Sequence, residues 1–132
     1  MKTLATVLLT VLSAFTLACG GYSSSQATTP PTAGTMPNIA ALAPSSANAG
    51  STSVVLTVNG TNFNSNAAIN WKGTALTTTY VSGAQLMTTI PDADVAASGT
   101  AAVTVTNPGT AGGIYGGGTA AETSNSMTFT IN

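Results

Sequence analysis

Charged side chains are almost absent from this chain of 132 residues. Two are basic and three are acidic, and histidine is missing altogether. Binding to nucleic acid depends largely on neutralising phosphates with Lys and Arg, so this charge balance excludes a nucleic-acid partner. General acid–base and nucleophilic catalysis need several titratable groups close together, and the chain offers few. We therefore expect a protein that is not an enzyme and needs no cofactor.

Cysteine is equally scarce, because Cys19 is the only one. The chain can form no internal disulfide, so its stability must come from packing alone. Hydrophobic residues make up 43% of the chain, and after residue 53 they alternate with polar ones. This is not the low-hydrophobicity, high-charge composition of a chain that cannot bury a core. A folded domain is expected in the C-terminal two thirds.

The first residues have the pattern of an export signal. Lys2 supplies a positive charge, an apolar run extends from Leu4 to Leu17, and the small residue Ala18 precedes Cys19. The run is shorter than the ~20 residues that a membrane-spanning helix needs, and it begins at the extreme N-terminus. The pattern predicts a signal peptide over residues 1–18.

The stretch Thr16-Leu17-Ala18-Cys19 resembles the lipobox of bacterial lipoproteins, matching it at Ala18 and Cys19 and departing from its usual Leu at Thr16. The resemblance implies that Cys19 is the lipid attachment site and that the protein is exported to the cell envelope, anchored to a bacterial membrane. A triacylated N-terminus anchors stably, at ~0.8 kcal/mol per buried CH₂ group. The alternative is an ordinary secretory signal that ends near Cys19 and releases a secreted protein.

Residues 19–36 are dominated by Ser, Thr, Gly and Pro and show no apolar period. Pro30-Pro31 favours extended polyproline geometry over a packed element. We expect a disordered, lipid-anchored tether that holds the domain away from the membrane.

From Pro37 onward the pattern is that of short strands. Apolar and polar residues alternate with a period of two, and turn residues recur about every ten positions, which predicts a two-sheet all-β sandwich. The expected strands cover residues 37–44, 54–59, 67–72, 74–81, 85–90, 100–106 and 127–131. Residues 92–99 are expected to form a polar connection and residues 109–125 a Gly-rich excursion.

Residues 37–132 as a whole resemble an IPT/TIG domain. The motifs that carry the resemblance are Pro37-x-Ile39-x-x-Leu42-x-Pro44, Val54-x-Leu56-x-Val58-x-Gly60-x-Asn62-Phe63, Ile69-x-Trp71-x-Gly73, Val81-Ser82-x-x-Gln85-Leu86, Ile90-Pro91, Gly99-Thr100-Ala101-Ala102-Val103-x-Val105-x-Asn107-Pro108 and Phe129-x-Ile131. The resemblance implies an immunoglobulin-like fold and an extracellular adhesive or architectural module. The excursion at 109–125 departs from the tighter last hairpin expected for the family.

Three aromatic residues are candidates for ligand contact. Trp71 shares a strand face with Ile69, which favours a place in the core over a platform for sugar rings. Tyr115 stands between glycines in the excursion, where an exposed aromatic on a loop is a reasonable recognition residue. Tyr80 is intermediate between these cases.

No metal site is predicted. Asp92-x-Asp94 offers oxygen ligands of the kind that Ca²⁺ takes, but Ca²⁺ needs six to eight of them and Glu122 is the only other carboxylate. Solvated loop charges are the preferred interpretation. The glycines at 112–118 are not a phosphate-binding loop, because the Lys-Ser/Thr pair that ends such a loop is missing.

Two functions from different classes remain open. The first is a structural or protein-interaction module of the cell surface, which docks an envelope protein along an exposed strand edge. The second is a carbohydrate-binding module that holds a polysaccharide with exposed aromatics. An uncharged, Thr-rich surface also favours self-association through strand edges.

Overall fold

The computed structural model describes residues 29–114 and 116–132. The expected signal peptide, Cys19 and Tyr115 lie outside these residues. The strands are β1 (Asn38–Ala43), β2 (Ser46–Ala47), β3 (Val54–Thr61), β4 (Ala68–Trp71), β5 (Thr74–Ala75), β6 (Thr78–Ser82), β7 (Gln85–Ile90), β8 (Gly99–Asn107), β9 (Glu122–Thr123) and β10 (Met127–Ile131), with one 3₁₀ turn, η1 (Asp92–Val95).

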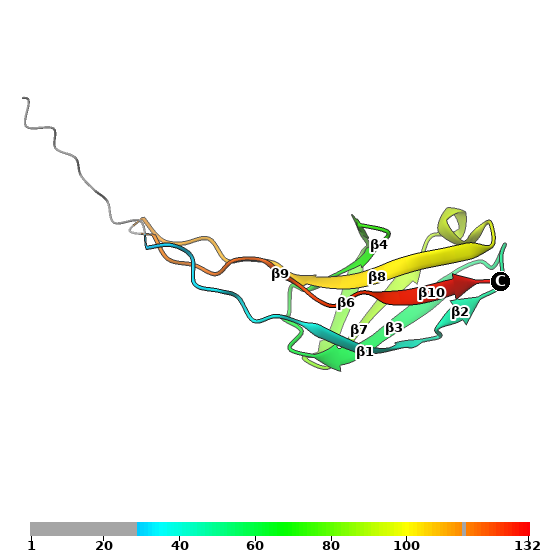
Figure 1. Ribbon diagram of the computed structural model, residues 1–132, viewed down its shortest axis with the longest axis horizontal. Coiled ribbons are helices and arrows are strands. Elements are labelled where there is room, and N and C mark those ends of the chain that lie inside the picture. The colour runs from blue at the N-terminus through cyan, green and yellow to red at the C-terminus, as the bar shows by residue number, and fades with distance from the viewer. Residues whose placement is uncertain (1–28, 115) are drawn as a thin grey trace, which may run out of the picture.

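The strands form two sheets (Figure 1). One has four strands in the order β1-β3-β7-β6, and the other follows the order β2-β10-β8-β4-β5, with β9 paired to β8. Neighbours are antiparallel except for β10 and β2. The predicted all-β sandwich is confirmed, and the seven longer strands correspond to the seven that the alternation predicts.

The core lies between the sheets and is built from alternate side chains of each strand, as the two-residue period requires. On β3 and β7, for example, Val58 pairs with Leu86 in the register, and both side chains are fully buried. Trp71 and Phe129 meet edge to face, with ring centroids 5.2 Å apart. The buried apolar residues are Ile39, Leu42, Leu56, Val58, Phe63, Ala67, Ile69, Trp71, Leu86, Ile90, Val95, Ala101, Val103, Val105, Phe129 and Ile131.

The segment expected as one strand over residues 74–81 is in fact divided between the two sheets. Its first part is β5, which pairs with β4, and its second part is β6, which pairs with β7. Thr78 holds the crossing point, because its Oγ1 accepts a 2.9 Å bond from Ile69 N and donates a 3.0 Å bond to Leu76 O. The expected polar connection at 92–99 also differs, since η1 within it buries Val95 completely.

Residues 29–35, 108–114 and 116–121 together form an arm, here called the stalk, that projects from one end of the sandwich (Figure 1). The Gly-rich excursion folds back on itself through paired backbone bonds between Thr110 and Thr119. Residues 29–35 lie beside it in parallel, with Thr32 N donating to Gly118 O at 3.0 Å and Thr32 O accepting from Ala120 N at 2.9 Å. Residues 29–35 of the expected disordered tether are therefore paired with the excursion. The boundary between tether and domain at residue 37 stays a prediction.

Glycine permits this close approach of backbones. Gly118 has φ +96, and a Cβ there would collide with the carbonyl oxygen of Thr110. A Cβ at Gly34 would collide with the carbonyl oxygen of Ala120. Gly109, Gly112 and Gly118 of the excursion are therefore packing positions, since a Cβ there would collide with backbone, whereas Gly113 and Gly117 have open space around them.

Asn107 joins the stalk to the sandwich and is only 2% exposed. Its Nδ2 donates 2.8 Å bonds to Thr35 O in the stalk and to Asn62 O in the bend after β3. Its Oδ1 accepts a 3.0 Å bond from Asn64 N. One buried amide thus satisfies three backbone groups from two separate segments, as buried polar groups require.

Candidate functional site

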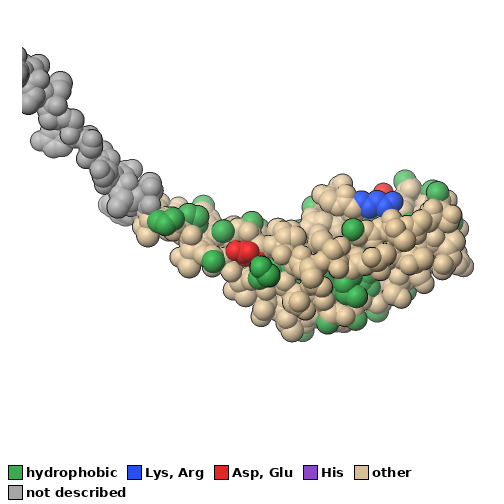
Figure 2. All heavy atoms as spheres, in the orientation of Figure 1, with side chains coloured by type: hydrophobic (Ala, Val, Ile, Leu, Met, Phe, Trp, Pro, Cys, Tyr) green, Lys and Arg blue, Asp and Glu red, His purple; other side chains and the backbone are tan. Residues whose placement is uncertain are grey.

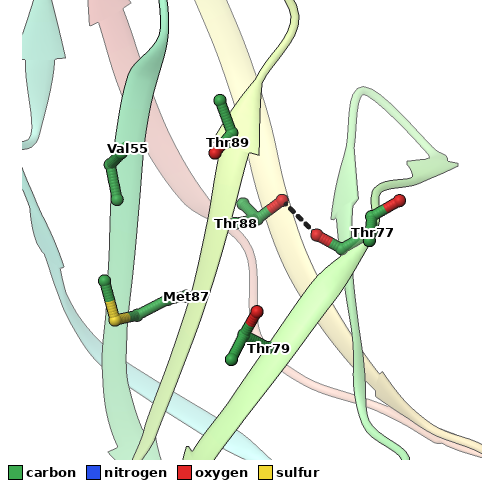
Figure 3. A pocket seen from close by; sticks show the side chains of 6 residues that line it. All are labelled: Val55, Thr77, Thr79, Met87, Thr88 and Thr89. Carbon is green, nitrogen blue, oxygen red and sulfur yellow. Dashed lines mark hydrogen bonds between the residues drawn. The ribbon is translucent and has the colours of Figure 1, made fainter.

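A groove of about 590 Å³ runs along the outer face of the four-stranded sheet. Its lining comes from β3, β7, β6 and the residue just before β6 (Figure 3). The residues are Val55, Thr77, Thr79, Met87, Thr88 and Thr89. Met87 extends from β7 toward β3, and the Thr88 hydroxyl donates a 2.8 Å bond to Thr77 O (Figure 3). The floor is therefore a sheet surface of methyl, thioether and hydroxyl groups.

The lining carries no titratable side chain, so it offers nothing for acid–base chemistry. Val55 is 47% exposed, which is unusual for an aliphatic side chain in the middle of a sheet. Among residues 29–114 and 116–132, no three His, Cys, Asp or Glu side chains gather where they could hold a metal ion. The arrangement is suited to recognising an uncharged surface.

Strand β6 forms one edge of the same sheet and borders the groove through Thr79. Tyr80 is 41% exposed and Val81 is 48% exposed. The strand contains neither a charged residue nor a proline, which are two of the devices that blunt a free edge. A register shift between Tyr80 and Ser82 is its one irregularity. Such an edge presents backbone donors and acceptors to any extended chain that approaches.

The three candidate aromatics are not brought together. Trp71 is 2% exposed and lies in the core, which is the favoured interpretation of its pattern, and its indole has no accessible face for a sugar ring. Its Nε1 has no hydrogen-bond partner among the described residues. Tyr80 lies on the β6 edge of the other sheet. Tyr115 is outside the described residues, and so is Cys19.

The family model that matches the chain is described as IPT/TIG domain and covers residues 37–131. The chain belongs to the IPT/TIG family. This confirms the resemblance of residues 37–132 to an IPT/TIG domain, and with it the immunoglobulin-like sandwich. IPT/TIG domains are non-catalytic immunoglobulin-like modules typically used for protein interaction. No curated protein and no solved structure matches the chain.

The carboxylates of this IPT/TIG domain lie near different ends of β8. Asp92 Oδ1 accepts a 2.8 Å bond from Ser53 N, beside the turn that leads into the strand at Gly99. Glu122 pairs with Asn107 at the other end, about 26 Å away along the strand at ~3.3 Å per residue. Asp92 is exposed, and its side chain is bonded to the backbone amide of Ser53, whose φ is 53°.

The groove was not predicted from the sequence, although one signal for it exists. The two-residue alternation that buries Leu56 and Leu86 turns Val55 and Met87 outward, where a polar residue is the usual choice for a solvated face. Two apolar side chains on the outward face of adjacent strands indicate a contact surface. Within the described residues, no helix is long and apolar enough to span a bilayer.

Proposed function

We propose that this chain is an exported cell-envelope lipoprotein, attached to a bacterial membrane through Cys19, whose IPT/TIG domain is a non-catalytic protein-interaction module. Its partner supplies an extended, uncharged segment that adds to the sheet at β6. The secretory pattern of residues 1–18 and the lipobox-like residues before Cys19 support the address. The family's usual role in protein interaction supports the class of activity.

The observation that carries the interaction is the exposed β6 edge beside the groove. In β-strand addition, the backbone bonds of the edge provide affinity and pockets for alternate side chains provide specificity. Here the edge is β6, and the groove beside Thr79 can receive the side chains on one face of the incoming strand. The groove has no charged lining residue, so it favours an incoming segment with small apolar and hydroxyl side chains.

The test uses two lysine substitutions on exposed threonines. Thr79→Lys places a charge at the β6 edge and groove, which discourages strand addition, whereas Thr128→Lys places the same charge on β10 in the other sheet. An envelope protein cross-linked to the wild type should be lost with Thr79→Lys and kept with Thr128→Lys, with unchanged melting for both. Equal capture by the two variants would contradict docking at β6. Sedimentation of the same variants shows whether a second copy is the partner.

Carbohydrate binding is the second candidate, and within the described residues it rests on Tyr80 alone because Trp71 is buried. Stacking of one aromatic on a base or sugar ring requires an exposed face, which Tyr80 at 41% exposure retains. Tyr80→Ala should abolish polysaccharide retention if this function holds. Under strand addition it should leave the backbone contacts of β6, and hence protein capture, largely intact.

A further inference from the structure

The outer end of the stalk is a tight turn that exposes an aliphatic side chain. Gly116 N donates a 2.9 Å bond to Gly113 O, which closes the turn around Ile114. Ile114 is 82% exposed, more than any other large hydrophobic residue among the described ones. Central turn positions usually hold Gly, Pro, Asn, Asp or Ser, each for a conformational reason. An isoleucine supplies none of these reasons, and its exposed side chain is available for a contact outside the chain.

The chain leads toward the lipid attachment site from this same end. Thr29, the first described residue, pairs with Gly116 next to the turn, and its carbonyl accepts a 3.3 Å bond from Gly117 N. In Figure 1 this end is the part of the described chain farthest from the sandwich. Nine residues lie between Cys19 and Thr29, so ten Cα–Cα steps allow a reach of at most about 36 Å.

The tip of the stalk has no charged side chain that would have to lose its hydration on contact with an apolar surface. Residues 29–35 and 108–121 contain no Lys, Arg, Asp or Glu. Figure 2 shows hydrophobic side chains and no charged ones at the outer end of the stalk, with the first acidic group nearer the sandwich. A neutral tip with an exposed isoleucine is suited to the boundary between headgroups and acyl chains, where apolar side chains are buried and no ion has to be desolvated.

We propose that the tip of the stalk, centred on Ile114, is a second contact with the membrane that holds Cys19. This inference rests on the proposed lipid attachment. A single-point anchor leaves a domain free to turn, whereas an anchor and a paired stalk that touches the bilayer fix its orientation. The stalk then sets the distance between the sandwich and the lipid. The contact is uncharged, so it does not require anionic lipids.

The experiment places a unique thiol at the tip. When Cys19 carries its lipid thioether, Ile114→Cys provides the one reactive thiol of the full-length protein, and Ser98→Cys provides a matched exposed site between η1 and β8. Each variant is labelled with a polarity-sensitive fluorophore and reconstituted in phosphatidylcholine vesicles with brominated acyl chains. The label at position 114 should shift to shorter wavelength and be quenched, and the label at position 98 should not.

A second pair of variants tests the isoleucine itself. Ala111→Cys, labelled on the same hairpin, should be quenched with Ile114 present and lose that quenching with Ile114→Asp. Equal emission at positions 98 and 114, or no effect of Ile114→Asp, overturns the membrane contact while leaving lipid attachment in place. Failure of the attachment appears separately, as a second labelled thiol at position 19 and loss of vesicle binding by every variant.

Discussion

Asn107 is the residue whose removal should reveal how the stalk is joined to the sandwich. Its side chain makes three hydrogen bonds, to Thr35 O, Asn62 O and Asn64 N, at 2.8, 2.8 and 3.0 Å. Asn107→Ala deletes all three and leaves two carbonyls and one amide without this partner. Each such bond contributes about 1 kcal/mol net, and a stranded buried group costs about 1–3 kcal/mol.

We therefore expect Asn107→Ala to lower the free energy of unfolding by about 2–4 kcal/mol, since water reaches some of the freed groups. This is a large part of the roughly 5–15 kcal/mol typical of a domain. Urea denaturation followed by Trp71 fluorescence measures it. Asn66→Ala, in the same bend and exposed, is the control and should change stability by less than about 0.5 kcal/mol.

Asn107→Asp sharpens the test. A carboxylate can accept the bond from Asn64 N. Its other oxygen, however, would face the carbonyl oxygens of Thr35 and Asn62, to which Asn107 Nδ2 donates in the wild type. The folded state therefore favours the protonated acid, which raises the pKa of the introduced carboxyl above its unfolded value. The stability of this variant should be highest at acidic pH and fall as pH rises through that raised pKa. An Asn107→Ala variant as stable as Asn66→Ala would refute the role assigned to this amide.

Two further substitutions test the core and the stalk. Trp71→Phe should cost only about 1–2 kcal/mol, because the lost Nε1–H has no partner among the described residues, whereas Trp71→Ala should cost about 3–5 kcal/mol by leaving a cavity against Phe129; equal losses in urea denaturation would show that the indole N–H is bonded. Gly118→Ala should speed amide hydrogen exchange at Thr119, because it combines a positive φ with a collision at Thr110 O. Gly113→Ala, with open space around its Cβ position, should leave that exchange unchanged.

Much of the fold could be predicted from alternation alone. A strand with one buried face must place every second side chain inward, so Leu56 with Val58, and Val103 with Val105, mark their strands and their core faces together. The turn at Lys72-Gly73 could also be predicted, since Gly favours a tight corner, and both residues take positive φ (48° and 86°) in a two-residue hairpin.

The stalk and the sheet crossing could not be predicted in the same way. A Gly-rich segment has the same composition whether it is a loose loop or a place where backbones touch, and the residues paired with Thr29 and Thr32 lie 87 positions later in the chain. The Thr-rich segment 74–81 contains no Gly or Pro, although the chain changes sheets at Leu76 and Thr77. That change is decided by Thr78 bonding to Ile69 across the sandwich, which no local pattern encodes.

The candidate site shows the same division. The core position of Trp71 could be predicted, because Trp71 and Ile69 lie on the same face of one strand. The exposed edge at Tyr80 could not, because it depends on the order of the strands in the sheet, which the sequence does not reveal. The groove required knowing that β3, β7 and β6 are neighbours. Only then do Val55 and Met87 become parts of one surface.

Lipid attachment at Cys19 underlies both the proposed address and the proposed membrane contact, and the mass of the N-terminal peptide from membrane-extracted protein tests it most directly. We expect a peptide that begins at Cys19, carries a diacylglyceryl thioether on the sulfur and is acylated at its amine. A peptide that begins elsewhere, or one that carries Cys19 as an unmodified thiol, would contradict the account.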